Sequence, residues 1–164
     1  MNTTKKIILI LVVVFAAMQV IVIKKKVPET DPALEYTKNE TVPDDIAGLI
    51  KASCYDCHSY ETRYPWYSNV APVSWLLNSH IQEARKHLNF SVWGEYSSKR
   101  KMAMKEECRE MLEENEMPLK SYLLMHPEAR LSDKEKDALM QWFNLQADMF
   151  VSPVFIKCWI MNMI

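Results

Sequence analysis

Five consecutive residues, Cys54-Tyr55-Asp56-Cys57-His58, constrain this chain more than any other segment. On a helical turn, residues three positions apart share a face, so the thiols of Cys54 and Cys57 are expected to point the same way. The Cys-x-x-Cys-His pattern is the attachment signature of c-type haem, in which two thiols hold the porphyrin and the histidine binds the iron. The pattern predicts a domain folded around a covalent haem c, with His58 as the proximal ligand.

Other uses of a Cys-x-x-Cys pair fit this sequence less well. A thioredoxin-like dithiol needs a β-α-β context, which the chain lacks. A zinc site needs a second pair of ligands with comparable spacing, and none is evident among Cys108, Cys158 and the other histidines. A disulfide between Cys54 and Cys57 would close too short a loop to stabilise much. The surrounding sequence therefore favours haem.

A long apolar run lies near the N-terminus. Residues 7–23 read IILILVVVFAAMQVIVI and contain one polar residue, Gln19. As a helix the run would be about 25 Å long, close to the roughly 30 Å core of a bilayer, and the lysines on both flanks could reach the interfaces. We expect a single transmembrane helix within residues 1–26; a cleaved signal peptide with a small-residue site near Ala16 is the alternative.

The haem motif also predicts where the protein is located. Covalent haem attachment takes place outside the bacterial cytoplasm, so the anchor is expected to lie in the cytoplasmic membrane with the haem domain facing the periplasm or the cell exterior. The lysines on the two sides of the apolar run do not themselves decide the orientation, because both flanks are positive.

Charge is distributed unevenly along the chain. The net charge is -1, but the first 26 residues contain five lysines and no acidic residue, so residues 27–164 contain 15 basic and 21 acidic residues, a net of -6. Such a surface does not attract nucleic acid or anionic lipid by bulk electrostatics. We expect no nucleic-acid partner, a membrane contact through the anchor, and a redox protein partner that the sequence does not identify.

The rest of the sequence predicts an all-α fold. No segment alternates with period two for long enough to form a strand, and the last helix opens with the capping box Ser132-x-x-Glu135. Apolar periodicity predicts helices over residues 44–52, 73–89 and 99–115, and from Ser132 onward. The expected organisation is an anchor or signal segment (1–26), a flexible linker with three prolines (27–43), a haem-binding domain (44–149) and an apolar tail of unknown role (150–164).

The sixth position of the iron needs a further ligand. Met117 is the candidate, because a thioether stabilises ferrous iron and because Pro118 holds the preceding residue extended. His80, His87 and His126 are the rival ligands, and the sequence leaves the choice open.

Two further groups of residues are singled out by the sequence. The aromatic loop 64–67 and Trp75 are expected to wall the haem, with Arg63 available for a propionate; plain core packing is the alternative. Cys108 lies on an inward-facing helical stripe and is expected to be a buried free thiol, or else to form a disulfide with Cys158.

Three separated blocks resemble a known family. The stretches CYDCHSYETRYPWYSNVAPVSW, HLNFSVW and EMPLKSYLLMHPEARLSDKEKDALMQW, in this order, resemble the haem-binding domain family of small, membrane-anchored bacterial proteins with a CxxCH motif. The resemblance covers residues 46–142. It implies a cytochrome c-like helical fold with covalent haem, Cys54 and Cys57 as the thioether cysteines, His58 as the proximal ligand, and Met117 as the distal ligand.

Two classes of function follow from these expectations. The first is a membrane-anchored monohaem cytochrome that transfers single electrons on the periplasmic side. It is favoured over an enzyme because no acid–base pair is evident in the sequence. The alternative is a haem enzyme of the peroxidase type, or a sensor of small ligands, with a displaceable distal ligand.

Overall fold

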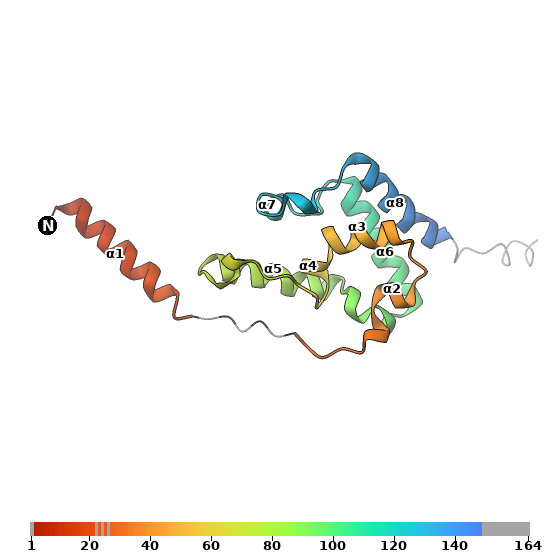
Figure 1. Ribbon diagram of the computed structural model, residues 1–164, viewed down its shortest axis with the longest axis horizontal. Coiled ribbons are helices and arrows are strands. Elements are labelled where there is room, and N and C mark those ends of the chain that lie inside the picture. Colours follow the sequence, from red (N-terminus) through yellow and green to blue (C-terminus); the bar gives the residue numbers. More distant parts are fainter. Residues whose placement is uncertain (1, 22, 24, 26, 149–164) are drawn as a thin grey trace, which may run out of the picture.

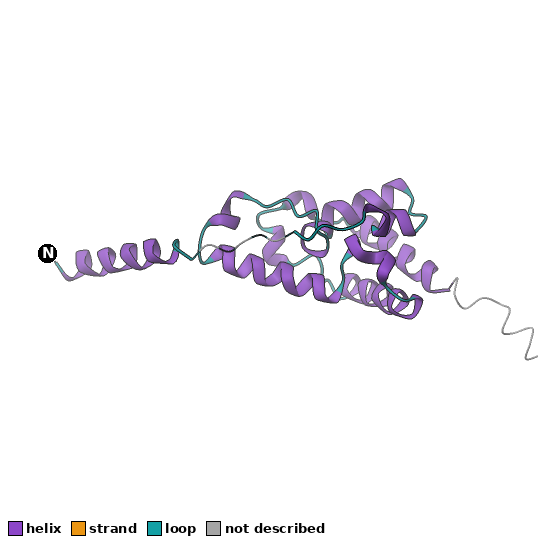
Figure 2. Ribbon diagram, turned by 90° about the horizontal axis from the view of Figure 1, so that it is seen from below, coloured by secondary structure: helices purple, strands orange, loops and turns teal. Residues whose placement is uncertain are grey.

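The computed structural model describes residues 2–21, 23, 25 and 27–148, and every regular element within them is a helix (Figure 1, Figure 2). This confirms the all-α class. The predicted tail, with Cys158, lies outside the described residues. The α-helices are α1 (Thr3–Met18), α2 (Tyr36–Asn39), α3 (Asp44–Ser53), α4 (Tyr55–His58), α5 (Val73–His87), α6 (Ser98–Glu113), α7 (Lys120–Leu123) and α8 (Asp133–Asp148). The 3₁₀ helices are η1 (Pro32–Leu34), η2 (Trp66–Asn69), η3 (Phe90–Glu95) and η4 (Pro127–Ala129).

Helix α1 stands apart from the rest of the chain, and none of its residues is buried (Figure 1). It accounts for only part of the predicted membrane-spanning helix, because it ends at Met18. The next residues form short turns, in which Val20 N–H donates to Ala17 O (3.2 Å) and Ile21 N–H donates to Met18 O (3.2 Å). Of the helices in the described part of the chain, none has both the length and the apolar content needed to cross a membrane.

The predicted flexible linker is in fact partly folded into the domain. From Pro32 onward the chain forms η1 and α2, and the side chain of Tyr36 is fully buried. Its ring lies edge-on to Phe90 (5.1 Å between centroids) and to Trp93 (4.8 Å), and its hydroxyl accepts a hydrogen bond from Trp142 Nε1 (2.9 Å). The correction has a simple physical reason: one large aromatic residue can be buried without any apolar periodicity around it.

Two further contacts fix this segment in place. Glu40 pairs with the buried Lys105 (3.1 Å) and accepts a hydrogen bond from Trp93 Nε1 (2.8 Å). Gly94 is needed for the close approach of η1, because a Cβ there would lie 2.9 Å from Leu34 Cδ2 and 3.2 Å from its Cα. The domain therefore begins near Pro32 and not at residue 44.

The helices that the periodicity predicts supply a further part of the core. Helix α6 packs along α8, and α3 contacts α8 as well. Leu139 and Phe143 of α8 are buried, as are Met104 and Leu112 of α6. The predicted capping box is present, with Ser132 N–H donating to the Glu135 carboxylate (2.7 Å) and Glu135 N–H donating to Ser132 Oγ (3.4 Å). These four helices (α3, α5, α6 and α8) form the frame on which the Cys-x-x-Cys-His segment is held.

Candidate functional site

The Cys54–His58 segment forms one turn of helix. Helix α3 ends at Ser53, Cys54 occupies the junction, and α4 begins at Tyr55. The carbonyl of Cys54 accepts hydrogen bonds from the N–H groups of both Cys57 (3.2 Å) and His58 (2.9 Å), so the segment is wound tightly. The two thiols are thus one turn apart, as the spacing predicts, and both are free and half-buried.

Burial sets the protonation state of the two thiols. It raises the pKa of Cys54 to about 12 and the pKa of Cys57 to about 11. Both groups therefore remain protonated thiols at neutral pH.

The imidazole of His58 is held in one tautomer. Its Nδ1 lies 3.1 Å from the carbonyl oxygen of Leu88, at the end of α5. A carbonyl can only accept, so Nδ1 carries the proton and Nε2 keeps its lone pair. Burial lowers the pKa of His58, which keeps the ring neutral. A neutral imidazole with a free Nε2 is the form that binds iron.

A buried arginine, which the sequence analysis missed, fixes the loop after the motif. Arg85 of α5 donates from Nε to the carbonyl oxygen of Ser59 (2.8 Å) and from Nη2 to Thr62 Oγ1 (2.8 Å). Thr62 Oγ1 in turn donates to the carbonyl of Asp56 (2.7 Å). Arg85 lies one residue from the apolar stripe of its helix, so periodicity alone assigns it to the surface.

Asp56, inside the motif, connects three segments of the chain. Its carboxylate accepts hydrogen bonds from the N–H of Arg63 (2.9 Å), from the Arg63 guanidinium (3.3 Å) and from the hydroxyl of Tyr122 in α7 (2.7 Å). Burial and the bond to Asp56 raise the pKa of Tyr122, so this hydroxyl stays protonated and remains a donor. The Asp56–Tyr122 bond places the segment that follows Met117 against the motif.

Replacing Tyr122 by phenylalanine is expected to loosen this connection. The ring is kept and one hydrogen bond to a carboxylate is lost, so the free energy of unfolding should fall by about 1.5 kcal/mol. Urea unfolding would measure the loss, and amide hydrogen exchange should speed up over residues 117–126. Tyr64→Phe is the matched control, because the Tyr64 hydroxyl takes part in none of these contacts; an equal loss in both variants would contradict the assignment.

The candidate distal ligands lie in different environments. Met117 follows α6, and its N–H donates to Met111 O (3.2 Å). His80 and His87 are exposed on α5, and His87 faces Glu83 (3.4 Å). His126 is engaged at both nitrogens, by the Tyr67 hydroxyl at Nε2 (2.7 Å) and by Glu128 at Nδ1 (3.0 Å). Ligation of iron by His126 would therefore break an existing hydrogen bond, whereas the thioether of Met117 forms none of these bonds.

The aromatic residues that are predicted to wall a haem lie in different environments, and Trp66 is 74% exposed. Tyr67 is half-buried and contacts His126, and Arg63 is paired with Asp56. Trp75 donates from Nε1 to the carbonyl of Ile21 (3.1 Å), away from the motif. The sequence pattern could not separate these roles, because aromatic residues serve both cores and surfaces.

Cys108 is a free, half-buried thiol packed against the core, which agrees with the first of the two expectations for it. Burial raises its pKa strongly, so it also remains protonated. It lies on α6, outside the turn that holds Cys54 and Cys57.

The groups of the motif fit a covalent haem. Two thiols lie three positions apart on one turn, and the imidazole of His58 follows with its Nδ1 held by the carbonyl of Leu88. These are the three groups that the attachment of c-type haem uses.

Comparison with known proteins agrees with this geometry. The sequence model of the haem-binding domain family matches residues 13–145, which include the motif, the Met117 segment, helices α3, α5 and α6, and most of α8. Neither the curated proteins nor the solved structures contain a significant match. Because the match spans most of the chain, this protein belongs to the haem-binding domain family.

Proposed function

We propose that this protein is a monohaem c-type cytochrome that transfers single electrons. The observation that supports this most directly is the turn from Cys54 to His58, on which two thiols and a hydrogen-bonded imidazole lie together. A bound haem would supply a one-electron couple at its iron. Cys54 and Cys57 hold the porphyrin edge, and His58 offers Nε2 to the iron in a fixed orientation.

The neighbouring residues keep this arrangement rigid. Leu88 O fixes the ring of His58, Arg85 fixes the loop after the motif, and Asp56 attaches α7. An electron carrier gains from a rigid site, because less rearrangement then accompanies the change of charge. A cytochrome c-like wrapping of the helices around the haem is part of this proposal.

Met117 is the proposed distal ligand. Its segment is tied to the motif by the Tyr122–Asp56 bond, and its thioether would stabilise ferrous iron. The test is the absorption spectrum of the purified full chain, oxidised and reduced, with the pyridine haemochrome. We expect a haem c spectrum and a six-coordinate, low-spin iron.

Met117→Ala is expected to leave the haem attached but to remove the long-wavelength charge-transfer band of methionine-ligated ferric haem and to lower the potential. Met125→Ala is the control, since Met125 is 55% exposed. A five-coordinate, high-spin wild-type haem, or a spectrum unchanged by Met117→Ala, would contradict the assignment.

The alternative, a haem enzyme or small-ligand sensor, is favoured by one observation. His126 lies between Glu128 and Tyr67 in a hydrogen-bonded chain of the kind that moves protons in acid–base catalysis. Peroxidase turnover by the wild type that is lost in His126→Gln would support this alternative over electron transfer. Tight binding of CO to the ferrous wild type would support it as well.

We further propose that the N-terminal segment anchors the protein in the bacterial cytoplasmic membrane, with the haem domain outside. From Ile7 to Met18, helix α1 is apolar all round and its large apolar side chains are exposed, which is typical of a helix surrounded by lipid. Its apolar part, residues 7–18, is about 18 Å long, well short of the roughly 30 Å core of a bilayer. The span would therefore have to include the apolar residues that follow, as far as residue 23.

A further inference from the structure

The chain that follows α1 is attached to one end of the domain. The side-chain amide of Gln19 forms a pair of hydrogen bonds with the backbone of Ala71, accepting from its N–H (3.0 Å) and donating to its carbonyl (3.1 Å). Trp75 Nε1 donates to the carbonyl of Ile21 (3.1 Å). These contacts join segments more than 50 residues apart in the sequence.

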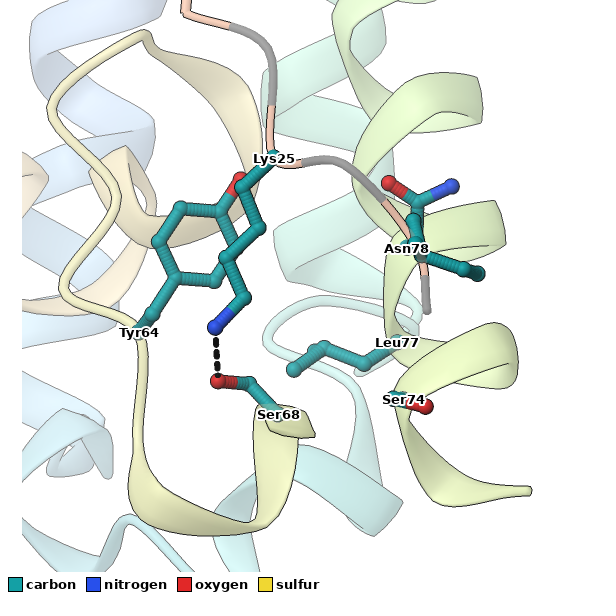
Figure 3. A pocket seen from close by; sticks show the side chains of 7 residues that line it. Lys25, Tyr64, Ser68, Ser74, Leu77 and Asn78 are labelled. Carbon is teal, nitrogen blue, oxygen red and sulfur yellow. Dashed lines mark hydrogen bonds between the residues drawn. The ribbon is translucent and has the colours of Figure 1, made fainter. Parts of the chain in front are cut away.

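Lys25 makes further contacts with the same end of the domain (Figure 3). Its ammonium group donates to Ser68 Oγ (2.7 Å) and to Asn69 Oδ1 (2.7 Å), and it lies 4.7 Å from the centre of the Tyr64 ring. Ile23, Ser74, Leu77 and Asn78 complete the small pocket into which it reaches. The segment after α1 is thus seated on η2 and the start of α5.

The same end of the domain exposes large apolar side chains. Trp66 is 74% exposed, Leu76 59% and Val73 45%, all on η2 and the first turn of α5. We call this surface, residues 64–79, the apolar tip. Although a quarter of the chain is charged, no charged residue occurs anywhere in the apolar tip.

The position of the apolar tip relative to α1 is clear in both ribbon views. Helix α1 extends away from the end of the domain where α5 begins, whereas α6 and α8 lie toward the opposite end (Figure 1, Figure 2). A bilayer that contains α1 would therefore meet the domain at the apolar tip.

We propose that the apolar tip rests in the interfacial layer of the membrane that holds α1. Three observations support a lipid occupant. The tip is continuous with an exposed apolar helix, residues 64–79 include no charged side chain of their own, and the tip places an exposed tryptophan next to the chain that leaves that helix. Tryptophan is enriched at the boundary between lipid and water, where its ring is partly desolvated. This inference rests on the proposed membrane anchor and adds to it a fixed orientation of the haem domain.

The proposal is tested with a photoreactive benzoylphenylalanine placed singly in the full chain, reconstituted in phosphatidylcholine vesicles. Position 66 probes the apolar tip, and position 76 is a second probe of the same surface. Position 15, in α1, reports on the anchor. Position 141 is the matched control, because Gln141 is exposed on α8 at the far end of the domain. All four side chains are exposed, so the replacements leave the core intact.

We expect lipid adducts at positions 15, 66 and 76, with roughly tenfold less adduct at 141, since only residues in the interfacial layer meet acyl chains. Adducts at position 15 but not at 66 or 76 would overturn the proposed contact between the apolar tip and the membrane, while still supporting α1 as the membrane anchor. The absence of adducts at 15 would overturn the anchor as well. Adducts at 141 equal to those at 66 would also overturn the orientation.

The attachment itself provides a second arm of the test. Gln19→Ala, combined with Lys25→Ala, removes the bonds that these two side chains make to the domain and leaves the bond from Trp75 Nε1 to the carbonyl of Ile21. The adduct yield at position 66 should then fall several-fold relative to position 15. An unchanged ratio would contradict the role of these bonds in orienting the domain.

Discussion

Replacing both Cys54 and Cys57 by serine is expected to abolish covalent haem attachment. Wild-type haem should stay with the polypeptide through acid–acetone extraction, because thioether bonds survive this treatment, whereas haem held only by His58 is removed. In the double variant the haem that remains after extraction should fall to background. The measurement is the pyridine haemochrome of the extracted protein, compared with its concentration.

Cys108→Ser is the matched control for this experiment. Cys108 is a third half-buried thiol with a strongly raised pKa, but it lies outside the motif turn. The haem content of the Cys108→Ser variant should equal that of the wild type. Extraction-resistant haem in the double variant, or its loss in Cys108→Ser, would refute attachment through the motif.

Replacing Tyr36 by alanine is expected to cost the domain a large part of its stability. The side chain is fully buried, packs against Phe90 and Trp93, and accepts a hydrogen bond from Trp142. Removal of a buried aromatic side chain costs about 3–5 kcal/mol, against a total of about 5–15 kcal/mol for a typical domain. Urea unfolding followed by far-ultraviolet circular dichroism measures the change.

Lys38→Ala provides the control within the same segment. Lys38 is exposed on α2, so its replacement should change the free energy of unfolding by less than about 0.5 kcal/mol. A chain that begins at residue 44 should behave like Tyr36→Ala, since it lacks the same side chain. If Tyr36→Ala were as stable as Lys38→Ala, residues 32–43 would not belong to the core.

The parts of the fold that periodicity specifies could be predicted from the sequence. Two apolar stripes are buried as predicted, one with Leu139 and Phe143 and the other with Met104 and Leu112. Each could be recognised because apolar residues recur at helical spacing over several turns. The Ser132 capping box is a local pattern, and it marks the start of α8 correctly. The helical turn of the Cys-x-x-Cys-His motif is also predicted, from the three-residue spacing of its cysteines.

Features that depend on single residues could not be predicted in this way. Tyr36 lies in a proline-containing segment, and its burial depends on partners far along the chain, Phe90, Trp93 and Trp142. Arg85 and Asp56 have the composition of surface residues, and only their hydrogen-bond partners explain their burial. The positions of Met117 and of the rival histidines depend on long-range packing, so the choice of distal ligand remains a proposal to be tested by spectroscopy.

The hydrogen bond from Trp142 to Tyr36 also bears on the order of events during synthesis. Because it joins the first folded segment to the last helix, the core cannot close until nearly all of the domain has been made. The Cys-x-x-Cys-His turn is complete more than 80 residues earlier. If the domain folds outside the cytoplasm, as proposed above, both thiols are presented to solvent before α8 packs over the core, and their access to a haem donor is greatest in that interval.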